Sequence, residues 1–454
     1  MNFTDRMFLL WYDTASVAAV LPAGMVHWTL ISFPLGVVTF ATSFVAQYEG
    51  AGRARRIAAV LGQGYWSSLA VSPLLLATIP WAESGFRALG HEAHLAGLEA
   101  EYFRIAMLSA PAMLISGVQA AFFTGRGDTR HVMLVDTTAA GANILLDYLW
   151  IFGRGGFPEL GLAGAAWAST VCQWLKVILF GLLLAGRRYA GYQLGQAWRL
   201  EIPLMRRLWY YGAPNGLQWL LEGAGFTIFL LFVAQLGESA TAATNLAFNV
   251  NSVAFIPPLG LAIAVTTLVG QQIGAGRKDL ADRVTWTGFQ LAGIYTGVLA
   301  LLYVLLPDLF LAFYAAGKNA AEFATIRQEV IVLLRFVAAY CVFDAMNLVF
   351  SGALRGAGDT RFILKVGLLM CPIPGVLTWI GVRYLDAGLV WSWWVLTLWT
   401  CVLGVVYLIR YLQGHWRNIW LIEQAFIEES QEFEPAAVGA DDRSEPKPSA
   451  LVEC

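Results

Sequence analysis

Charged residues are scarce in this chain. Asp, Glu, Lys and Arg make up only 13% of its 454 residues, whereas a soluble domain has about 25%. Hydrophobic residues make up 58%, and there are 45 glycines and 18 tryptophans. Such a composition is typical of a protein with many membrane-spanning segments. The net charge of −2 gives no general excess of positive charge, so we expect no nucleic acid as a partner.

The chain also lacks the residue clusters of a metal centre, a disulfide framework or an enzyme active site. Four of the five cysteines stand singly in apolar runs, and no CxxC or Cys/His metal spacing occurs. The five histidines are scattered near helix ends and in loops. No clustered His or Ser/His/Asp arrangement is visible. We therefore expect no metal and no cofactor, and a membrane-embedded enzyme is a less favoured alternative.

Apolar runs long enough to cross a membrane recur along the chain. A helix needs about 20 residues to cross about 30 Å of hydrocarbon. About eleven runs reach this length. They lie near 24–48, 57–82, 102–123, 131–153, 161–186, 208–236, 239–270, 284–313, 324–353, 361–383 and 387–413. These runs predict an all-α polytopic membrane protein.

Two short polar motifs occur twice, once in each half of the chain. The turn Gly125-Arg126-Gly127-Asp128-Thr129-Arg130 returns as Gly356-Ala357-Gly358-Asp359-Thr360-Arg361. Gln47 with Gly50-Ala51-Gly52-Arg53 returns as Gln271 with Gly274-Ala275-Gly276-Arg277. The second pair lies about 224 residues apart, which is too long for a solenoid repeat. The repetition predicts two homologous halves of one membrane protein.

The duplication predicts two pseudo-symmetric lobes of six helices. We place the N-lobe at 1–190, an inter-lobe cytoplasmic linker at 191–207, the C-lobe at 208–413 and a largely disordered tail at 414–454. The repeat offset puts the counterpart of the run at 208–236 before residue 12, so the first helix is truncated here. We expect the native protein to carry residues upstream of the first one. The alternative is a genuine half-helix, which would leave backbone groups unpaired against lipid.

Arg and Lys gather in alternate connections between the apolar runs. The turns near 12–23 and 237–240 carry neither residue. The positive-inside rule therefore places the C-terminus and both Gly-Asp-Thr turns in the cytoplasm. Within those turns we expect a glycine in the left-handed region and an aspartate or threonine that caps the next helix. The basic connections are 49–57, 125–130, 187–207, 274–283 and 355–365.

Carboxylates inside apolar spans are functional candidates because burying a charge in a membrane is costly. In the second half, Glu222 lies in the middle of a run. Asp344 follows Tyr340 by one helical turn and precedes Asn347 by three residues, so the three share a helix face. Such a stripe can bind a proton or a small hard cation. An inert, satisfied polar network is the alternative.

Two aromatic residues flank Glu222 at helical spacing. They are Trp219 and Phe226, and we expect them, together with Asn347, to line a substrate cavity.

The first half carries a similar polar stripe. Asn143 and Asp147 are four residues apart, and Asp5 and Thr170 can complete an oxygen-lined site. Oxygen ligands suit Na⁺ or a shared proton better than a soft metal. The alternative for Asp147 is an interfacial helix end, since it stands near the end of its run.

These motifs together resemble the multidrug and toxic compound extrusion (MATE) family of bacterial transporters over nearly the whole chain. The resemblance rests on the two GxGDTR turns, the two QxxGAGR segments and Gly161-x-x-Gly164-Ala165-Ala166. It implies two six-helix lobes that form a V and alternate between outward-open and inward-open states. Cation entry from outside then drives drug export.

The resemblance also implies roles for the acidic residues. Asp5 is similar to the family's first-helix acid, and Asn143, Asp147 and Thr170 resemble its N-lobe cation network. Glu222, Tyr340 and Asp344 resemble the cation-coupling groups in the C-lobe of NorM-like members.

A multidrug efflux antiporter of the bacterial inner membrane is therefore the expected function. We expect coupling to Na⁺ or H⁺, amphipathic and often cationic substrates, and a monomer in the lipid bilayer. The alternative within the same superfamily is a flippase for lipid-linked precursors, which should have a cationic central cavity.

Overall fold

Helices account for nearly all of the structure. The computed structural model describes residues 2–196, 198–315, 320–385 and 387–423, and no β-strand occurs within them. The N-terminal half has α1 (Asn2–Tyr12), α2 (Thr14–Thr39), α3 (Ala41–Gly50), α4 (Ala54–Leu76), η1 (Ile79–Trp81), α5 (Ala82–Ala88), α6 (Ala93–Met107), α7 (Ala110–Gly125), α8 (Thr129–Ile151) and α9 (Gly161–Leu184). Two short 3₁₀ helices follow, η2 (Arg187–Tyr192) and η3 (Leu194–Gln196).

The C-terminal half repeats this succession of long helices. It has α10 (Ile202–Ala234), α11 (Glu238–Gly274), α12 (Lys278–Leu305), α13 (Pro307–Ala315), α14 (Ala320–Ala357), α15 (Thr360–Met370), α16 (Pro372–Tyr384), α17 (Leu389–Leu412) and η4 (His415–Asn418). The first long helix begins at Ile202 rather than near 208, because the helix continues on the N-terminal side of Arg206 and Arg207 through Leu204 and Met205.

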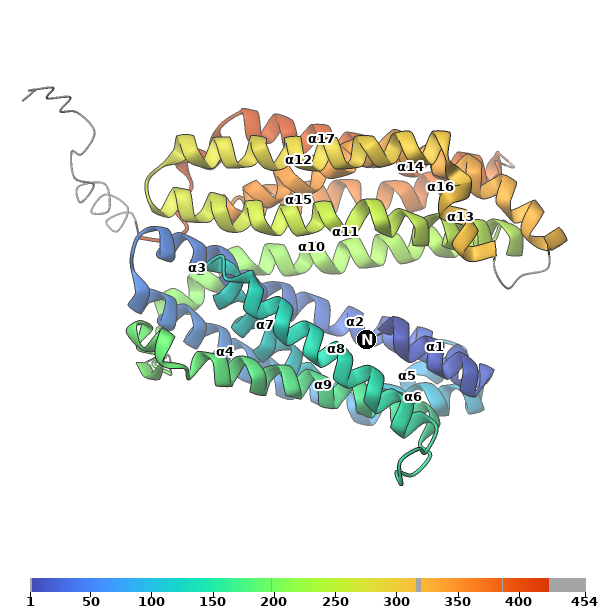
Figure 1. Cartoon of the computed structure of the whole chain (residues 1–454), viewed down its shortest axis with the longest axis horizontal. Helices are drawn as coiled ribbons and strands as arrows, with labels where there is room; N and C mark the ends of the chain where they lie inside the picture. Colours follow the sequence, from blue (N-terminus) through green and yellow to red (C-terminus); the bar gives the residue numbers. More distant parts are fainter. Residues whose placement is uncertain (1, 197, 316–319, 386, 424–454) are drawn as a thin grey trace, which may run out of the picture.

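The helices form two lobes, and the prediction of an all-α two-lobed protein is confirmed. Figure 1 shows α1 to α9 in one layer and α10 to α17 in the other. Each lobe has its own apolar core. Phe44 and Phe122 are fully buried in the first, and Phe350 and Trp393 are fully buried in the second.

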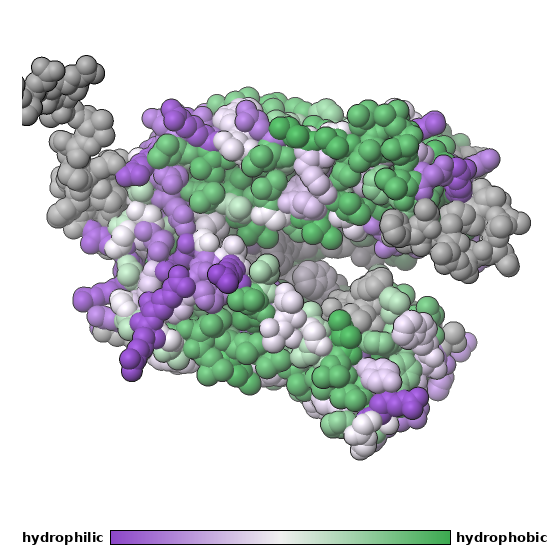
Figure 2. Space-filling model, in the orientation of Figure 1, coloured by the Kyte–Doolittle hydropathy of each residue, from purple (hydrophilic) through white to green (hydrophobic). Residues whose placement is uncertain are grey.

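The protein is built to cross a membrane several times. Within the described residues, nine helical segments are long and apolar enough to do so, or ten if the bent pair α6 and α7 counts as one span. Figure 2 shows hydrophobic residues over the middle of the molecule and hydrophilic ones toward both ends. The short α1 packs against α2, α8 and α9. The expectation of further residues before it stays a prediction.

The polar turns are only partly as predicted. Gly127 and Gly358 adopt positive φ angles of 78° and 95°, so the left-handed glycines are confirmed. Asp128 and Asp359 stand at the N-cap positions of α8 and α15, but neither side chain bonds to the helix amides. Asp128 Oδ1 lies 2.7 Å from His131 Nδ1, and Asp359 Oδ2 accepts a hydrogen bond from Arg410 Nε at 2.8 Å. The two aspartates therefore bond to side chains that can carry a positive charge instead of capping the amides of the next helix.

The duplicated motifs meet where the two lobes cross, in a contact that we call the seam. The side-chain amide of Gln47 donates to the carbonyl oxygen of Gly356 at 2.9 Å. That of Gln271 donates to the carbonyl oxygen of Gly125, also at 2.9 Å. Each glutamine motif thus bonds to the Gly-Asp-Thr turn of the opposite lobe.

Two glycines let the backbones approach closely at this seam. A Cβ atom on Gly50 would overlap the carbonyl oxygen of Gln271, and one on Gly274 would overlap that of Gln47. Both obstacles are backbone atoms, which cannot rotate away as a side chain can. The pseudo-symmetry of the sequence is therefore reproduced as a reciprocal contact.

Substituting either seam glycine by alanine should destabilise the protein. The added methyl group must force two helices apart, which costs about 1–3 kcal/mol in a well-packed interface. We expect a lower thermal unfolding midpoint of the purified protein for Gly50→Ala and for Gly274→Ala.

The matched control is Gly260→Ala in α11, where a Cβ would meet open space among the described residues. Removing a helical glycine there should be neutral or stabilise by up to about 1 kcal/mol. Midpoints for the seam variants equal to that of the control would contradict the close approach.

Candidate functional site

Polar side chains from three helices of the N-lobe converge around Asp5 of α1. Asp5, Asn143 and Asp147 are all buried, at 1%, 0% and 0% exposure. Ser169 Oγ of α9 donates to Asp5 Oδ2 at 2.7 Å, and Asn143 Nδ2 of α8 lies 3.4 Å from Ser169 Oγ. Asp147 lies one turn further along α8, close enough for its carboxyl group to interact with that of Asp5. The structure thus brings together three of the four predicted N-lobe residues.

Several oxygens of this cluster have unused acceptor capacity. Among the described residues, no donor stands in hydrogen-bonding geometry with Asp5 Oδ1, Asn143 Oδ1 or either carboxyl oxygen of Asp147. Two neighbouring buried carboxylates repel each other strongly when both are ionised, and either a shared proton or a bound cation relieves that repulsion. The donor set consists of hard oxygen atoms, which fits a proton or a small hard cation such as Na⁺.

Thr170 takes a different place from the one expected. Its hydroxyl donates to the carbonyl oxygen of Ile105 in α6 at 3.0 Å. The preceding residue, Ser169, makes the contact with Asp5 instead, and sequence reasoning missed it. The sequence shows that Ser169 precedes Thr170, but only the rotation of α9 about its axis decides which of the two hydroxyls faces Asp5. Asp5, Ser169 and Thr170 all line one cavity of about 320 Å³.

The C-lobe acids face a second cavity. Glu222 of α10 and Asp344 and Asn347 of α14 all line a cavity of about 270 Å³. Gln218 Nε2, one turn before Glu222, donates to Glu222 Oε1 at 2.8 Å. The carboxyl group of Asp344 interacts with both Asn347 and Glu222. Two helices far apart in the sequence therefore place two acids on one cavity wall.

Aromatic side chains complete this second cavity. Phe226, Trp399 and Tyr407 line it, and the ring of Phe226 packs edge to face against Phe248 with centroids 5.1 Å apart. Trp219, predicted as a cavity wall, is only half-buried and is not among the lining residues. The α10 residues that line the cavity form a stripe that includes Gln218, Glu222 and Gly225, and Trp219 lies beside this stripe.

Tyr340 is placed apart from the cavity that Asp344 lines. It is 4% exposed and packs in a C-lobe core cluster. It is still close enough to Asp344 for the two groups to interact electrostatically. Tyr340 can therefore influence the charge of Asp344 from the protein core, but it does not line the cavity.

The two acidic sites are separate, one in each lobe. They share no lining residue, and no Lys or Arg occurs among the described residues that line either cavity. The ionisable side chains that line the first cavity are Asp5, His27 and Tyr102. Those that line the second are Glu222, Asp344, Cys371 and Tyr407. Both cavities therefore favour positively charged ligands.

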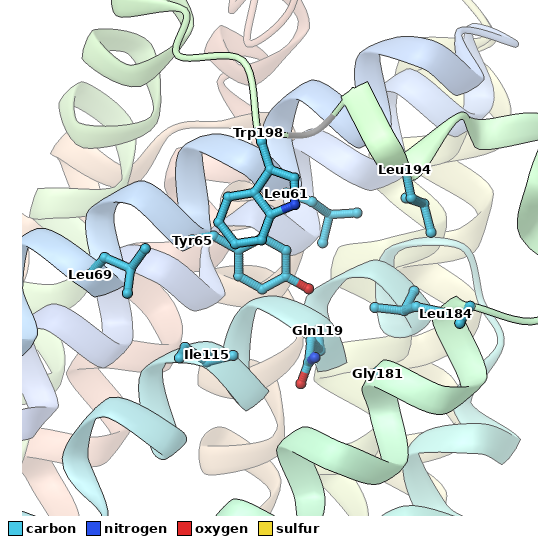
Figure 3. Close-up of a pocket in the computed structure, with 10 residues that line it drawn as sticks. Leu61, Tyr65, Leu69, Ile115, Gln119, Gly181, Leu184, Leu194 and Trp198 are labelled. Carbon is cyan, nitrogen blue, oxygen red and sulfur yellow. The ribbon is translucent and has the colours of Figure 1, made fainter.

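A third pocket, shown in Figure 3, lies between α4, α7, α9 and the linker between the lobes. It measures about 330 Å³, and Leu61, Tyr65, Gln119 and Trp198 are among its lining residues. The rings of Tyr65 and Trp198 stack with centroids 5.8 Å apart. None of the predicted site residues lines it, so it belongs to neither acidic cavity.

Known proteins resemble this chain over most of its length. The MatE family model matches residues 1–149 and 214–380, which is more than half of the chain. A probable multidrug resistance protein NorM of Burkholderia pseudomallei is 30% identical over 374 residues, covering 81% of this chain and 79% of that protein. One of the same description from Bradyrhizobium diazoefficiens is 30% identical over 425 residues, covering 90% and 88%.

The fold agrees with this relationship. A solved structure described as the outward-facing conformation of a multidrug resistance MATE family transporter of the MOP superfamily superimposes with a TM-score of 0.81. It is 20% identical and covers 92% of both chains, so the likeness shows the fold alone. With the family model and these relatives, the chain belongs to the MatE family and is a multi-pass membrane transporter rather than an enzyme.

Proposed function

We propose that this protein is an antiporter of the bacterial inner membrane that exports amphipathic cations in exchange for Na⁺ or H⁺. One observation carries the proposal: Asp5 lines the first cavity and Glu222 and Asp344 line the second, with no Lys or Arg among the described lining residues of either. The relatives described as probable multidrug resistance proteins support drug export. No cofactor other than the coupling ion is needed, and we propose that the protein works as a monomer.

The second cavity combines the two features that an amphipathic cation requires. Glu222 and Asp344 provide negative charge, whereas Phe226 and Trp399 provide aromatic surface. A cation gains from both a carboxylate and the face of an aromatic ring in a site of low polarity. We assign substrate binding to this cavity, with the acids also available to the coupling ion.

Exchange follows from competition for the same negative charge. A proton or Na⁺ that reaches Glu222 or Asp344 removes the attraction that holds a cationic substrate. In the N-lobe, the unused oxygens of Asp5, Asn143 and Asp147 offer a second place for the coupling ion. A membrane potential of about 100 mV contributes about 2.3 kcal/mol per charge moved inward, or roughly fiftyfold in concentration.

The orientation follows from the distribution of basic residues. The connections that contain Arg53, Arg126 and Arg277 all lie at the end where the lobes meet at the seam. Figure 2 shows the surface hollowed between the lobes toward the opposite end. If the basic end faces the cytoplasm, as the positive-inside rule directs, this conformation is closed inside and open outward. The tail after α17 then starts in the cytoplasm.

The polarity of the cavities bears on the alternative function. A flippase for lipid-linked precursors carries a polyanionic head group and needs a cationic cavity. The acidic linings of both cavities favour the antiporter instead.

A vesicle assay tests the proposed function directly. A fluorescent cation would be added to the medium around everted vesicles that contain the protein, with a pH gradient and a Na⁺ gradient imposed separately. We expect one of the two gradients to drive accumulation and the matching ionophore to abolish it. Accumulation that responds to neither gradient would overturn the antiporter assignment.

Removing the charge of a C-lobe acid should abolish coupled accumulation. For Glu222→Gln and Asp344→Asn we expect the sustained substrate gradient to fall by up to about fiftyfold at 100 mV for each coupling charge lost. Glu101→Gln, an exposed glutamate of α6, serves as the control for loss of one carboxylate. Parent-like gradients in both cavity variants, at equal membrane insertion, would sink the assignment.

Two neighbouring hydroxyls of α9 provide a test of the N-lobe site. Ser169→Ala leaves Asp5 Oδ2 without the donor seen at 2.7 Å, whereas Thr170→Ala removes only a bond to the backbone of α6. Loss of a hydrogen bond to a charged group is worth about 1.5–3 kcal/mol. We therefore expect Ser169→Ala to change the half-saturating concentration of the coupling ion by about tenfold or more. Thr170→Ala should stay near the parent, and equal effects of the two would contradict the assigned contact.

A further inference from the structure

The chain after α17 does not leave the molecule but turns back across the end where the lobes meet. Its first part is anchored on the C-lobe. Trp416 of η4 stacks on Tyr411 of α17 with ring centroids 5.2 Å apart, and Trp416 Nε1 donates to the carbonyl oxygen of Tyr411 at 3.1 Å. The α17 helix is thereby joined to a fixed turn rather than to a loose end.

The next residues enter the other lobe. Leu421 and Ile422 are both 0% exposed, and they belong to the apolar core cluster of the N-lobe. Ile419 and Leu421 also pass close to Gly358 of the second Gly-Asp-Thr turn, where a Cβ would lie 3.4 Å from each side chain. The first residues of the tail are thus ordered, and the expectation of a largely disordered tail stays a prediction for the rest. Residues 424–454 lie outside the described part of the chain.

Glu423 then fixes this segment by charge. Its carboxylate accepts a hydrogen bond from Tyr48 Oη at 2.6 Å and one from Arg56 Nη2 at 2.9 Å, and Arg207 Nη1 lies 3.5 Å away. Burial opposes the ionisation of Glu423, but the bond from Tyr48 and the charges of Arg56 and Arg207 outweigh it. Together they hold its pKa below the usual range. The carboxylate is therefore charged at physiological pH.

The backbone between these anchors is held as well. The carbonyl oxygen of Trp420 accepts hydrogen bonds from Arg207 Nη2 and Tyr211 Oη of α10, both at 3.3 Å. The ammonium group of Lys278, at the start of α12, lies 5.1 Å from the ring of Trp420. Helices of the C-lobe thus hold the backbone of this segment beside the seam, whereas Tyr48 and Arg56 of the N-lobe hold the carboxylate of Glu423.

We propose that residues 415–423 form a strap that locks the two lobes together at this end and must release before the transporter can open there. Because the strap continues from α17, separating the lobes requires Leu421 and Ile422 to leave the N-lobe core and Glu423 to leave Tyr48 and Arg56. The inference rests on the proposed exchange between outward-open and inward-open states. It adds the element that sets how readily the closed end opens.

A cysteine reporter in the seam measures this opening. Ser43 is 2% exposed, and its hydroxyl donates to the carbonyl oxygen of Arg355 in the opposite lobe at 3.1 Å. In a background without the native cysteines, Ser43→Cys would be labelled with a membrane-impermeant maleimide added to the cytoplasmic face. The labelling rate then reports the fraction of molecules whose seam is open.

Two changes should release the strap to different extents. For Glu423→Gln we expect the labelling rate to rise about fivefold, which corresponds to about 1 kcal/mol. The carboxylate is about one-third exposed, which limits the effect. Truncation after Gly414 removes the buried leucine and isoleucine too and should raise the rate further. Truncation after Glu423 keeps the strap and is the matched control, with a parent-like rate.

The outcomes separate the strap from the proposed function. Equal labelling rates in the parent, Glu423→Gln and the Gly414 truncation would overturn the strap. The strap would also be overturned if truncation after Glu423 raised the labelling rate as much as truncation after Gly414, since the residues that slow labelling would then lie beyond 423. The assay uses no substrate or ion gradient, so a parent protein that fails to transport would refute the antiporter while leaving the strap measurable.

A milder variant guards against misfolding. Tyr48→Phe deletes only the hydroxyl that donates to Glu423. We expect it to speed labelling by about twofold to threefold, less than Glu423→Gln, because Arg56 still donates to the carboxylate. The thermal unfolding midpoint of each variant shows whether it is folded. A folded Tyr48→Phe protein with the parent's labelling rate would count against the strap.

Discussion

The close approach of two backbones at the seam is the constraint on which the rest of the structure depends. Gly50 lies against Gln271 and Gly274 lies against Gln47, with no room for a side chain in either place. Helices that touch at one end and diverge toward the other leave space between the lobes. The acidic cavities stand within lobes arranged in this way. A rigid contact at one end also gives the lobes something to pivot about, because packed interfaces switch between discrete arrangements rather than deform continuously.

The two lobes share a scaffold but hold their acids differently. In the N-lobe, Asp5 and Asp147 are fully buried beside each other, and their free oxygens suit a small ion. In the C-lobe, Glu222 stands at an exposed position on an aromatic cavity wall, which suits a larger amphipathic cation. Duplication supplied the helices, whereas the ionisable groups differ between the halves. This asymmetry gives one chain two negative sites with different access.

Closure at the seam end of the molecule combines contacts of unlike character. The glutamine amides of the seam form neutral hydrogen bonds that the duplication makes reciprocal. The strap adds contacts of a second kind. Its contacts combine buried apolar side chains with a charged carboxylate. The strap adds strength on one side of a nearly symmetric joint.

The sequence by itself determined the all-helical membrane fold, the duplication and which acids stand within apolar spans. Apolar length and motif repetition depend only on the order of residues along the chain. It did not reveal that Ser169 rather than Thr170 faces Asp5, that Trp219 does not line the cavity, or that Leu421 and Ile422 enter the opposite lobe. Helix rotation and contacts between distant segments decide these points, and tertiary packing sets both. Local periodicity gives a helix face only to within a residue, so one hydroxyl cannot be told from its neighbour until the helices are packed.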